Sequence, residues 1–286
     1  MFKFQKYLSL IKFSHTIFAM PFALVGYFLA IKTEGNSFNL KILLLVILCM
    51  VLARSAAMAF NRMVDVRYDR KNPRTMNREI PSGQISLFAT SVFVFLTSIL
   101  FIVTTWFINP LVFYLSPVAL IVIFVYSFTK RFTSLCHFVL GLGLALAPIG
   151  AYLSVTAHFA VLPILFSFVV LLWVGGFDIL YALQDDDFDK SLNLHSIPVK
   201  VGRKTSLALS AFVHFIAIAI AFYAGCYGNF SNYYWIGLTI FSIMLIYEHL
   251  IVKPNDLTKV NMAFAIVNGV AGAIFGGFII ASLYFF

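Results

Sequence analysis

Runs of apolar residues long enough to cross a lipid bilayer recur along the chain, and they constrain its fold more than any other feature. A membrane-spanning α-helix needs about 20 mainly apolar residues. Hydrophobic residues make up 62% of the chain and charged residues 11%, which is typical of a protein embedded in lipid. The sequence therefore predicts an all-α, polytopic membrane protein that forms a single domain over residues 1–286. Hydropathy and loop residues place nine helices in one bundle, at about 15–32, 40–60, 86–108, 111–128, 134–155, 161–181, 205–226, 233–251 and 261–284.

The basic residues are distributed unevenly between the two faces of this predicted bundle. The N-terminal segment and the even-numbered loops hold most of the lysines and arginines, whereas the opposite face receives only Lys32 and Lys41. Because cytoplasmic loops are enriched in lysine and arginine, we expect a cytoplasmic N-terminus. The C-terminus is then expected on the opposite side of a bacterial inner membrane. The net charge of +9 reflects this topology, and no basic soluble module that binds nucleic acid is expected.

Two short segments carry acidic or amide side chains at intervals of four residues. On a helix, residues four apart lie on one face, roughly 40° apart around the axis and about 6 Å from each other. Both segments fall at the predicted cytoplasmic face, where the second and sixth spans end. Ionised groups beside lipid are costly unless they are paired, bound to a metal or hydrated, so the two segments predict a cation site. We call them the first stripe (Asn61, Asp65 and Asp69) and the second stripe (Tyr181, Asp185 and Asp189).

The ligand chemistry of the stripes favours magnesium and a phosphate-containing lipid. Mg²⁺ prefers oxygen ligands and usually takes one or two protein carboxylates together with water and substrate phosphates. Two facing stripes would suit two magnesium ions that bridge one diphosphate. Arg74 and Arg78 follow the first stripe, and Lys130 and Arg131 follow the fourth span, so cations for a diphosphate are close in sequence. The helices would hold an apolar tail, which predicts a lipid diphosphate as substrate.

The two stripes resemble the signature motifs of the UbiA-type intramembrane aromatic prenyltransferase family. The resemblance extends over nearly the whole chain, because the motifs also follow the expected spans on the expected side. Further stretches are similar to the quinone-biosynthesis branch, usually labelled 4-hydroxybenzoate polyprenyltransferase: Ser14-His15-Thr16, Asn72-Pro73-Arg74-Thr75 and Leu194-His195-Ser196-Ile197-Pro198. The motifs themselves read Asn61-Arg62-Met63-Val64-Asp65-Val66-Arg67-Tyr68-Asp69, Tyr126-Ser127-Phe128-Thr129-Lys130-Arg131 and Asp178-Ile179-Leu180-Tyr181-Ala182-Leu183-Gln184-Asp185-Asp186-Asp187-Phe188-Asp189.

This resemblance implies a helical bundle around a cavity open at the cytoplasmic side. It also implies Mg²⁺-dependent transfer of a polyprenyl group from a polyprenyl diphosphate to the ring of a 4-hydroxybenzoate-type acid, with release of pyrophosphate, in ubiquinone or menaquinone biosynthesis. The metal ligands implied by the resemblance are Asn61, Asp65, Asp69, Asp185 and Asp189. The catalytic set is Asp65, Asp69, Asp185, Asp189 and Lys130, with Arg74, Arg78 and Lys130 on the diphosphate and Arg54, Asp178, Tyr181 and His195 near the aromatic acceptor.

Three residues near the second stripe carry further expectations. Asp178 is expected to pair with a cation such as Lys130 inside the cavity. Asp186 and Asp187 point roughly 100° and 200° away from Asp185 around a helix, so neither is expected to bind metal.

Two alternatives remain beside 4-hydroxybenzoate prenylation. The same chemistry on 1,4-dihydroxy-6-naphthoate or another hydroxynaphthoate would serve a menaquinone route. A secondary transporter would also contain broken helices and charged residues inside its spans, but its binding site should lie near the bilayer midplane. The carboxylates here gather at one face, which favours an enzyme. The sequence leaves prenyl length and oligomeric state open.

Overall fold

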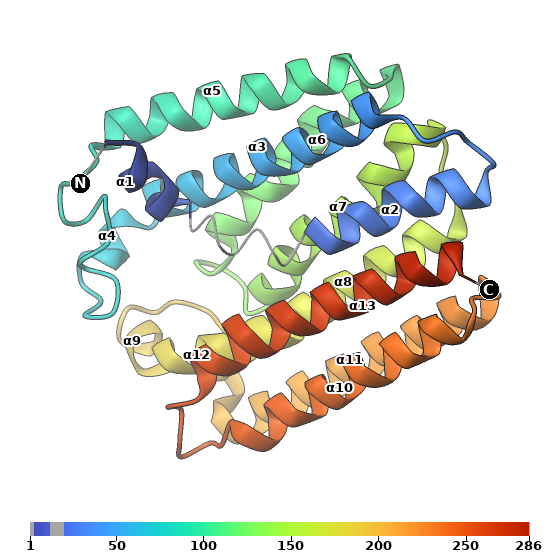
Figure 1. Ribbon diagram of the computed structural model, residues 1–286. Helices are drawn as coiled ribbons and strands as arrows, with labels where there is room; N and C mark the ends of the chain where they lie inside the picture. Colours follow the sequence, from blue (N-terminus) through green and yellow to red (C-terminus); the bar gives the residue numbers. More distant parts are fainter. Residues whose placement is uncertain (1–2, 12–19, 286) are drawn as a thin grey trace.

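The computed structural model describes residues 3–11 and 20–285, and every long element in this part of the chain is a helix (Figure 1). Eight apolar segments are long enough to cross a membrane, and the shorter apolar helix α2 (Met20–Thr33) brings the bundle to nine within the described residues. The predicted all-α polytopic fold is confirmed. The long segments are α3 (Leu40–Val64), α5 (Leu87–Trp106), α6 (Pro110–Thr129), α7 (Cys136–Thr156), α8 (Val161–Ala182), α10 (Ile197–Tyr227), α11 (Asn232–Ile251) and α12–α13 (Val260–Tyr284).

The first predicted span, 15–32, begins outside the described residues, as does the Ser14-His15-Thr16 stretch. The other predicted spans agree with the observed helices within a few residues, except that α10 begins at Ile197 and not at 205. Ser196 caps this helix by accepting a hydrogen bond from the backbone N–H of Val199. Gly202, with φ 76° and ψ 167°, then interrupts it, because glycine adopts positive φ without steric cost. A short helix therefore precedes the membrane span.

Polar side chains cap the beginnings of three other long helices. Asn39, Ser86 and Asn109 each accept a hydrogen bond from the backbone N–H three residues further along, at the start of α3, α5 and α6. Such caps satisfy donors that have no partner inside the helix. Caps therefore mark where apolar runs begin, and the runs themselves supply the surface that packs in the bundle or faces lipid.

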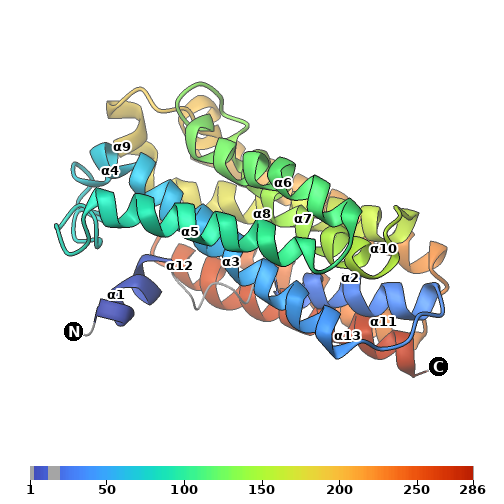
Figure 2. The ribbon, with the colours of Figure 1, turned by 90° about the horizontal axis from the view of Figure 1, so that it is seen from above.

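Helix α8 lies in the interior of the bundle, with α7 and α10 packed against it. Val169, Val170, Trp173 and Val174 of α8 are completely inaccessible to solvent. Helices α3, α5 and α6 form one side of the molecule, and α10, α11 and α13 form the other (Figures 1 and 2). The segment that follows α8 is thus anchored to the best-packed part of the protein.

The short helices gather at one end of the bundle. Helices α1 (Lys3–Leu10), α4 (Val66–Asp69) and α9 (Asp186–Ser191) lie at this end in both views, and α13 ends at the opposite end (Figures 1 and 2). Helix α4 follows α3 directly, and α9 follows α8 through one 3₁₀ turn, Leu183–Asp185. The fold therefore brings the two polar stripes to the same end of the molecule.

Candidate functional site

The first stripe lies where α3 passes into α4. Asn61 belongs to α3, Asp65 lies between the helices and Asp69 belongs to α4. The stripe was expected at helical spacing, and the structure places it across two helices, because Asp65 leaves helical geometry with φ −89° and ψ 4°. The four-residue hydrogen bonds survive the break: the backbone N–H of Asp65 donates to the Asn61 carbonyl (2.9 Å), and that of Asp69 to the Asp65 carbonyl (2.8 Å). The stripe keeps its spacing.

The second stripe contains a similar break. Tyr181 lies in the last turn of α8, Asp185 ends the 3₁₀ turn, and Asp189 belongs to α9. The second stripe was also expected at helical spacing, and it extends across two helices and the turn between them. Asp185 and Asp189 are buried, with 9% and 1% of their surface exposed. Buried carboxylates need partners to remain charged, and the structure shows which groups supply them.

The loop after the first stripe reaches the second stripe, more than 100 residues away in sequence. The side-chain amide of Asn72 donates to Asp185 Oδ1 at 3.0 Å. Arg74 donates from Nε to the same oxygen (3.0 Å), pairs through Nη2 with Asp185 Oδ2, and donates from Nη1 to the Tyr181 hydroxyl (2.9 Å). These bonds join the two stripes into one site.

Every carboxylate of the two stripes is paired with a basic side chain. Asn61 adds an amide, since its Nδ2 donates to Asp65 Oδ2 at 3.0 Å. The basic partners are the ones that the sequence placed near a diphosphate. The pairs are Arg131 with Asp65 (3.5 Å), Arg78 with Asp69 (2.9 Å), Arg74 with Asp185, and Lys130 with Asp189 (2.7 Å).

Burial and neighbouring charges shift the pKa values of two residues of the site, Asp65 and Lys130. Burial, together with the neighbouring Asp69 carboxylate, raises the pKa of Asp65 to about 6, although Arg131 and Lys130 oppose the shift. Burial would lower the pKa of Lys130, but the Asp189 carboxylate outweighs it and holds that pKa above its ordinary value. Lys130 therefore remains charged, and its field acts on Asp65 of the first stripe as well as on Asp185 and Asp189 of the second.

The expected pairing of Asp178 with Lys130 is wrong. Asp178 Oδ2 lies 2.7 Å from His137 Nδ1 of α7, whereas Lys130 is bound to Asp189. The His137 Nε2 atom accepts a hydrogen bond from the backbone N–H of Ile197, so Nδ1 carries the proton given to Asp178. The pairing follows from position, because Asp178 lies inside α8 beside α7 and Lys130 lies beyond the end of α6.

The extra carboxylates of the second motif pair elsewhere. Asp186 and Asp187 both bind Arg203 of α10, at 2.6 and 3.0 Å. This agrees with their expected direction away from the stripe. His195 contributes through its backbone, since its N–H donates to the Lys130 carbonyl at 2.7 Å while its side chain is exposed.

A cavity of about 370 Å³ extends through the bundle between α3, α5, α6 and α7. Its lining is almost entirely apolar, and Arg54 and Tyr126 are among its few polar residues. The buried Arg54 Nε has no hydrogen-bond partner among the residues that the structure describes. The site thus combines a charged end with an apolar chamber.

Sequence reasoning missed two contributors to this site. Asn72 belongs to the stretch Asn72-Pro73-Arg74-Thr75, which resembles the quinone-biosynthesis branch, and an amide two residues before an arginine was the available signal. His137 was not assigned to the site, although it falls in the predicted span 134–155 and a polar residue inside a span is a functional candidate. Neither partner could be assigned from spacing, because Asp185 and Asp178 are far away in sequence.

Comparison with known proteins identifies the family of this chain and supports its fold. A model of the UbiA prenyltransferase family matches residues 19–281. The chain is 28% identical over 216 residues to a protein from Francisella tularensis subsp. novicida named 4-hydroxybenzoate octaprenyltransferase, with 75% of each chain covered. The apo structure of a UbiA homolog from Aeropyrum pernix K1 has a TM-score of 0.84 at 30% identity, covering 93% of this chain and 97% of that one. A UbiA homolog from Archaeoglobus fulgidus, bound to DMAPP and Mg²⁺, shares the fold with a TM-score of 0.71 at 20% identity, over 98% and 100% of the two chains.

Proposed function

The chain belongs to the UbiA prenyltransferase family and is a prenyltransferase, and from this premise we propose that it transfers a polyprenyl group from a polyprenyl diphosphate to the ring of a 4-hydroxybenzoate-type acid. In this reaction the allylic carbon–oxygen bond breaks, a bond to a ring carbon forms, the ring loses a proton and pyrophosphate leaves. The observation that carries the proposal is the joining of the two carboxylate stripes by Asn72 and Arg74, beside an apolar cavity.

The donor set of the stripes fits magnesium. All of the carboxylates and the Asn61 amide offer oxygen, the ligand that Mg²⁺ prefers. They do not form one dense cluster: among the described residues, the one group of three potential metal ligands that lie close together is away from the stripes, between α10 and α11. Magnesium usually takes only one or two protein carboxylates, so separate stripes suit two ions that share one diphosphate. We assign Asn61, Asp65 and Asp69 to one ion and Asp185 and Asp189 to the other.

The basic residues would exchange partners when substrate binds. Arg74, Arg78 and Lys130 each neutralise a stripe carboxylate in the structure. Magnesium on those carboxylates would release the three cations for the diphosphate oxygens, which arginine binds with two parallel hydrogen bonds. When bound, magnesium supplies electrostatic stabilisation to the charge that develops on the leaving diphosphate. These three partly exposed cations would therefore be available to bind an anion.

The cavity suits the apolar part of the substrate. Its wall consists mainly of alanine, valine, leucine, isoleucine and phenylalanine side chains from four helices. A polyprenyl tail placed there would bury apolar surface and keep water away from the allylic carbon, where hydrolysis competes with transfer. The buried Arg54 Nε has no partner among the described residues, so the carboxylate of a benzoate could accept a hydrogen bond from it. We assign Arg54 to the acceptor, with Asp178, Tyr181 and His195 as neighbouring groups.

Orientation in the membrane is part of the same proposal. The end of the bundle that holds the stripes also holds α1 and the basic loops, so the positive-inside rule places it in the cytoplasm. Both substrates would then enter from the cytoplasmic side or its lipid leaflet. The N-terminus would be cytoplasmic and the C-terminus on the other side of the inner membrane.

A prenyl-transfer assay with purified protein tests the proposal. A polyprenyl diphosphate is offered with 4-hydroxybenzoate or with 1,4-dihydroxy-6-naphthoate, with and without magnesium, for the wild type and for Asp65→Ala and Asp185→Ala. Asp186→Ala is the matched control, because Asp186 adjoins Asp185 but binds Arg203.

We expect magnesium-dependent product with 4-hydroxybenzoate, lost in the two stripe variants and kept in the control. Product with only the naphthoate would show that the acceptor is a hydroxynaphthoate and not 4-hydroxybenzoate. Full activity in Asp65→Ala and Asp185→Ala would contradict the assigned site, and the absence of product with both acceptors in folded protein would contradict the assigned reaction.

A further inference from the structure

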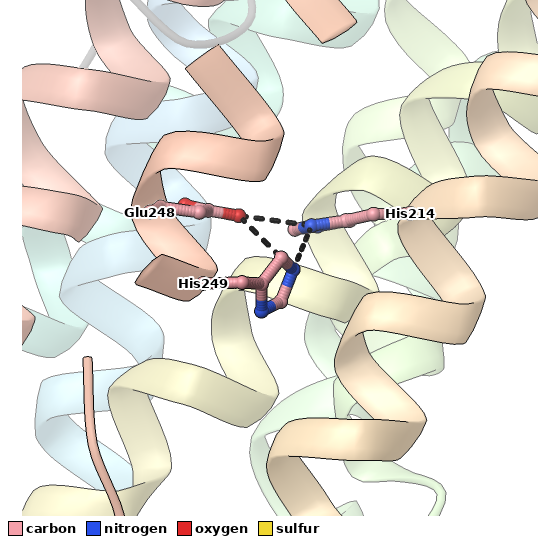
Figure 3. A group of neighbouring side chains, drawn as sticks. All are labelled: His214, Glu248 and His249. Carbon is pink, nitrogen blue, oxygen red and sulfur yellow. Dashed lines mark hydrogen bonds and ion pairs between the residues drawn. The ribbon is translucent and has the colours of Figure 1, made fainter. Parts of the chain in front are cut away.

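A second group of ligand-type side chains lies away from the stripes, between α10 and α11. His214 comes from α10, and Glu248 and His249 come from the last turns of α11. Figure 3 shows the three side chains pointing toward one another. His214 Nδ1 lies 2.8 Å from Glu248 Oε1 and 3.0 Å from His249 Nε2, and the last two atoms are 3.8 Å apart. Three potential ligand atoms thus share one small volume.

Glu248 lies in surroundings that make an uncompensated charge costly. None of its surface is exposed, and it is near the end of a helix that spans the membrane. Its Oε2 accepts a hydrogen bond from the Asn268 side chain, but its Oε1 has no hydrogen-bond partner among the described residues. A buried carboxylate is stabilised by a cation or by its own protonation. The orphaned oxygen is the one that faces the histidines.

The orientation of His214 places the lone pair of its Nδ1 atom beside the unpaired Oε1 of Glu248. Its Nε2 lies 3.0 Å from the backbone carbonyl of Trp173, which only accepts, so Nε2 carries a proton. In the neutral ring, Nδ1 is therefore unprotonated and faces Glu248 Oε1 and His249 Nε2. In the tautomer of His249 whose Nε2 is also unprotonated, three acceptors meet without a donor and repel one another. A cation between them would remove the repulsion.

We propose that His214, Glu248 and His249 bind a zinc-type divalent transition-metal ion. Zinc with bonds of about 2.0–2.1 Å and tetrahedral angles holds its ligand atoms about 3.3 Å apart, and the observed 2.8, 3.0 and 3.8 Å separations lie on both sides of that value. Two imidazole nitrogens select zinc over magnesium, which prefers oxygen. Three protein ligands leave the fourth position for water.

The groups around the three ligands have the arrangement that metal sites use. A ligating histidine usually donates its other ring N–H to a carbonyl or a carboxylate, and His214 donates to the Trp173 carbonyl. A ligating carboxylate is usually held as well, and Asn268 holds Glu248 while also accepting from the Trp173 indole at 2.7 Å. A Cβ on Gly176 would lie 2.2 Å from His214 Nε2, so glycine there leaves room for the ring.

The proposed ion would connect four membrane helices. Its ligands come from α10 and α11, and the groups that orient them come from α8 through Trp173 and from α13 through Asn268. Helix α8 also carries Asp178 and Tyr181 of the site described above. The ion would therefore be a structural cross-link that fixes α8 against the far half of the bundle, and it would take no part in prenyl transfer.

A single proton is the rival occupant. A protonated His214 would donate to Glu248 and satisfy the same contacts without metal. The metal content of the purified protein distinguishes a bound ion from a bound proton. The protein is purified with a tag that lacks histidine, incubated with zinc, dialysed against excess magnesium so that the stripes do not retain zinc, and analysed by elemental mass spectrometry. Cobalt(II) is bound in parallel, because its visible spectrum reports nitrogen and oxygen ligands in tetrahedral geometry.

The variants are chosen to keep the protein folded. His249→Ala removes the most exposed of the three ligands, 17% accessible, and Glu248→Gln keeps the shape of the buried side chain. His158→Ala removes a surface histidine that pairs with Glu34 and is the matched control. Asp65→Ala tests whether the stripes hold the zinc. Gel filtration and circular dichroism establish folding for each variant.

We expect one zinc ion per chain in the wild type, in His158→Ala and in Asp65→Ala. His249→Ala and Glu248→Gln should bind zinc at least about 100-fold more weakly, beyond the usual cost of losing a group that only orients a ligand. Zinc-free wild type after incubation would establish the proton and overturn the proposal. Equal zinc content in His249→Ala or loss of zinc in Asp65→Ala would also overturn it. Metal content does not depend on activity, so these results are independent of the proposed reaction.

Discussion

Replacing Asn72 by alanine should weaken magnesium activation without unfolding the protein. Asn72 and Asp185 are both buried, and the hydrogen bond between them is directed to a carboxylate proposed to bind magnesium. A hydrogen bond to a charged group contributes about 1.5–3 kcal/mol, and little solvent reaches this one to reduce it. Since about 1.4 kcal/mol corresponds to a factor of ten, the expected change is about 10- to 150-fold. The loss of a group that orients a metal ligand typically costs about 10- to 100-fold, which overlaps this range.

The assay is a magnesium titration of prenyl transfer at saturating substrate. For Asn72→Ala, the magnesium concentration that gives half-maximal rate should rise at least about tenfold. Asn109→Ala is the control, because Asn109 caps α6 and donates to the Leu153 carbonyl. Its loss should lower stability by about 0.5–2 kcal/mol and leave the titration unchanged. An Asn72→Ala titration that matches the wild type, in protein with a normal melting temperature, would refute the reasoning.

Three other outcomes follow from the same geometry. Removing magnesium with a chelator should abolish transfer reversibly, and activity that persists in chelator would contradict the metal assignment. Arg54→Ala should raise KM for the aromatic acid about 10-fold or more through loss of a charge-assisted bond, while KM for the prenyl diphosphate changes little; equal effects on both would remove Arg54 from the acceptor site. Ala57→Phe should fill part of the cavity and lower kcat/KM for long polyprenyl diphosphates more than for short ones, and a uniform decrease would indicate general damage.

Most of the fold could be predicted because it depends on local composition. A segment in lipid must satisfy its own backbone hydrogen bonds, so an apolar run of sufficient length becomes a helix whatever surrounds it. The spans predicted at 40–60, 161–181 and 233–251 accordingly match α3, α8 and α11 within a few residues. The start of α10 was missed because Gly202 interrupts a helix in a polar segment, where hydropathy carries little signal.

The composition of the candidate site was also accessible from the sequence. Carboxylates at four-residue spacing are rare in an apolar chain, and both stripes fell at the ends of spans on the same side. The basic partners Arg74, Arg78 and Lys130 were identified as cations near a diphosphate, and the structure brings all three to stripe carboxylates. What failed was the assignment of individual pairs, such as Asp178 with Lys130, because each candidate had several possible partners.

The interior histidines show the same limit more clearly. His214 and His249 are 35 residues apart, and this separation gave no reason to group them. The structure brings His214 to Glu248 and His249 because α10 and α11 pack side by side. A ligand set assembled from different helices leaves no spacing in the sequence.

By itself, the sequence determined that this chain is an integral membrane bundle and that its carboxylate stripes gather at one end, and it predicted which residue types would meet the substrate. These properties follow from hydrophobicity and from helical periodicity, which act between residues close in the chain. Only the tertiary structure decided that Arg74 and Asn72 hold Asp185, that His137 holds Asp178 and that Glu248 lies between two histidines. Such pairs depend on helix packing, because a contact between distant segments is set by how all of the helices fit together and not by the local run of residues.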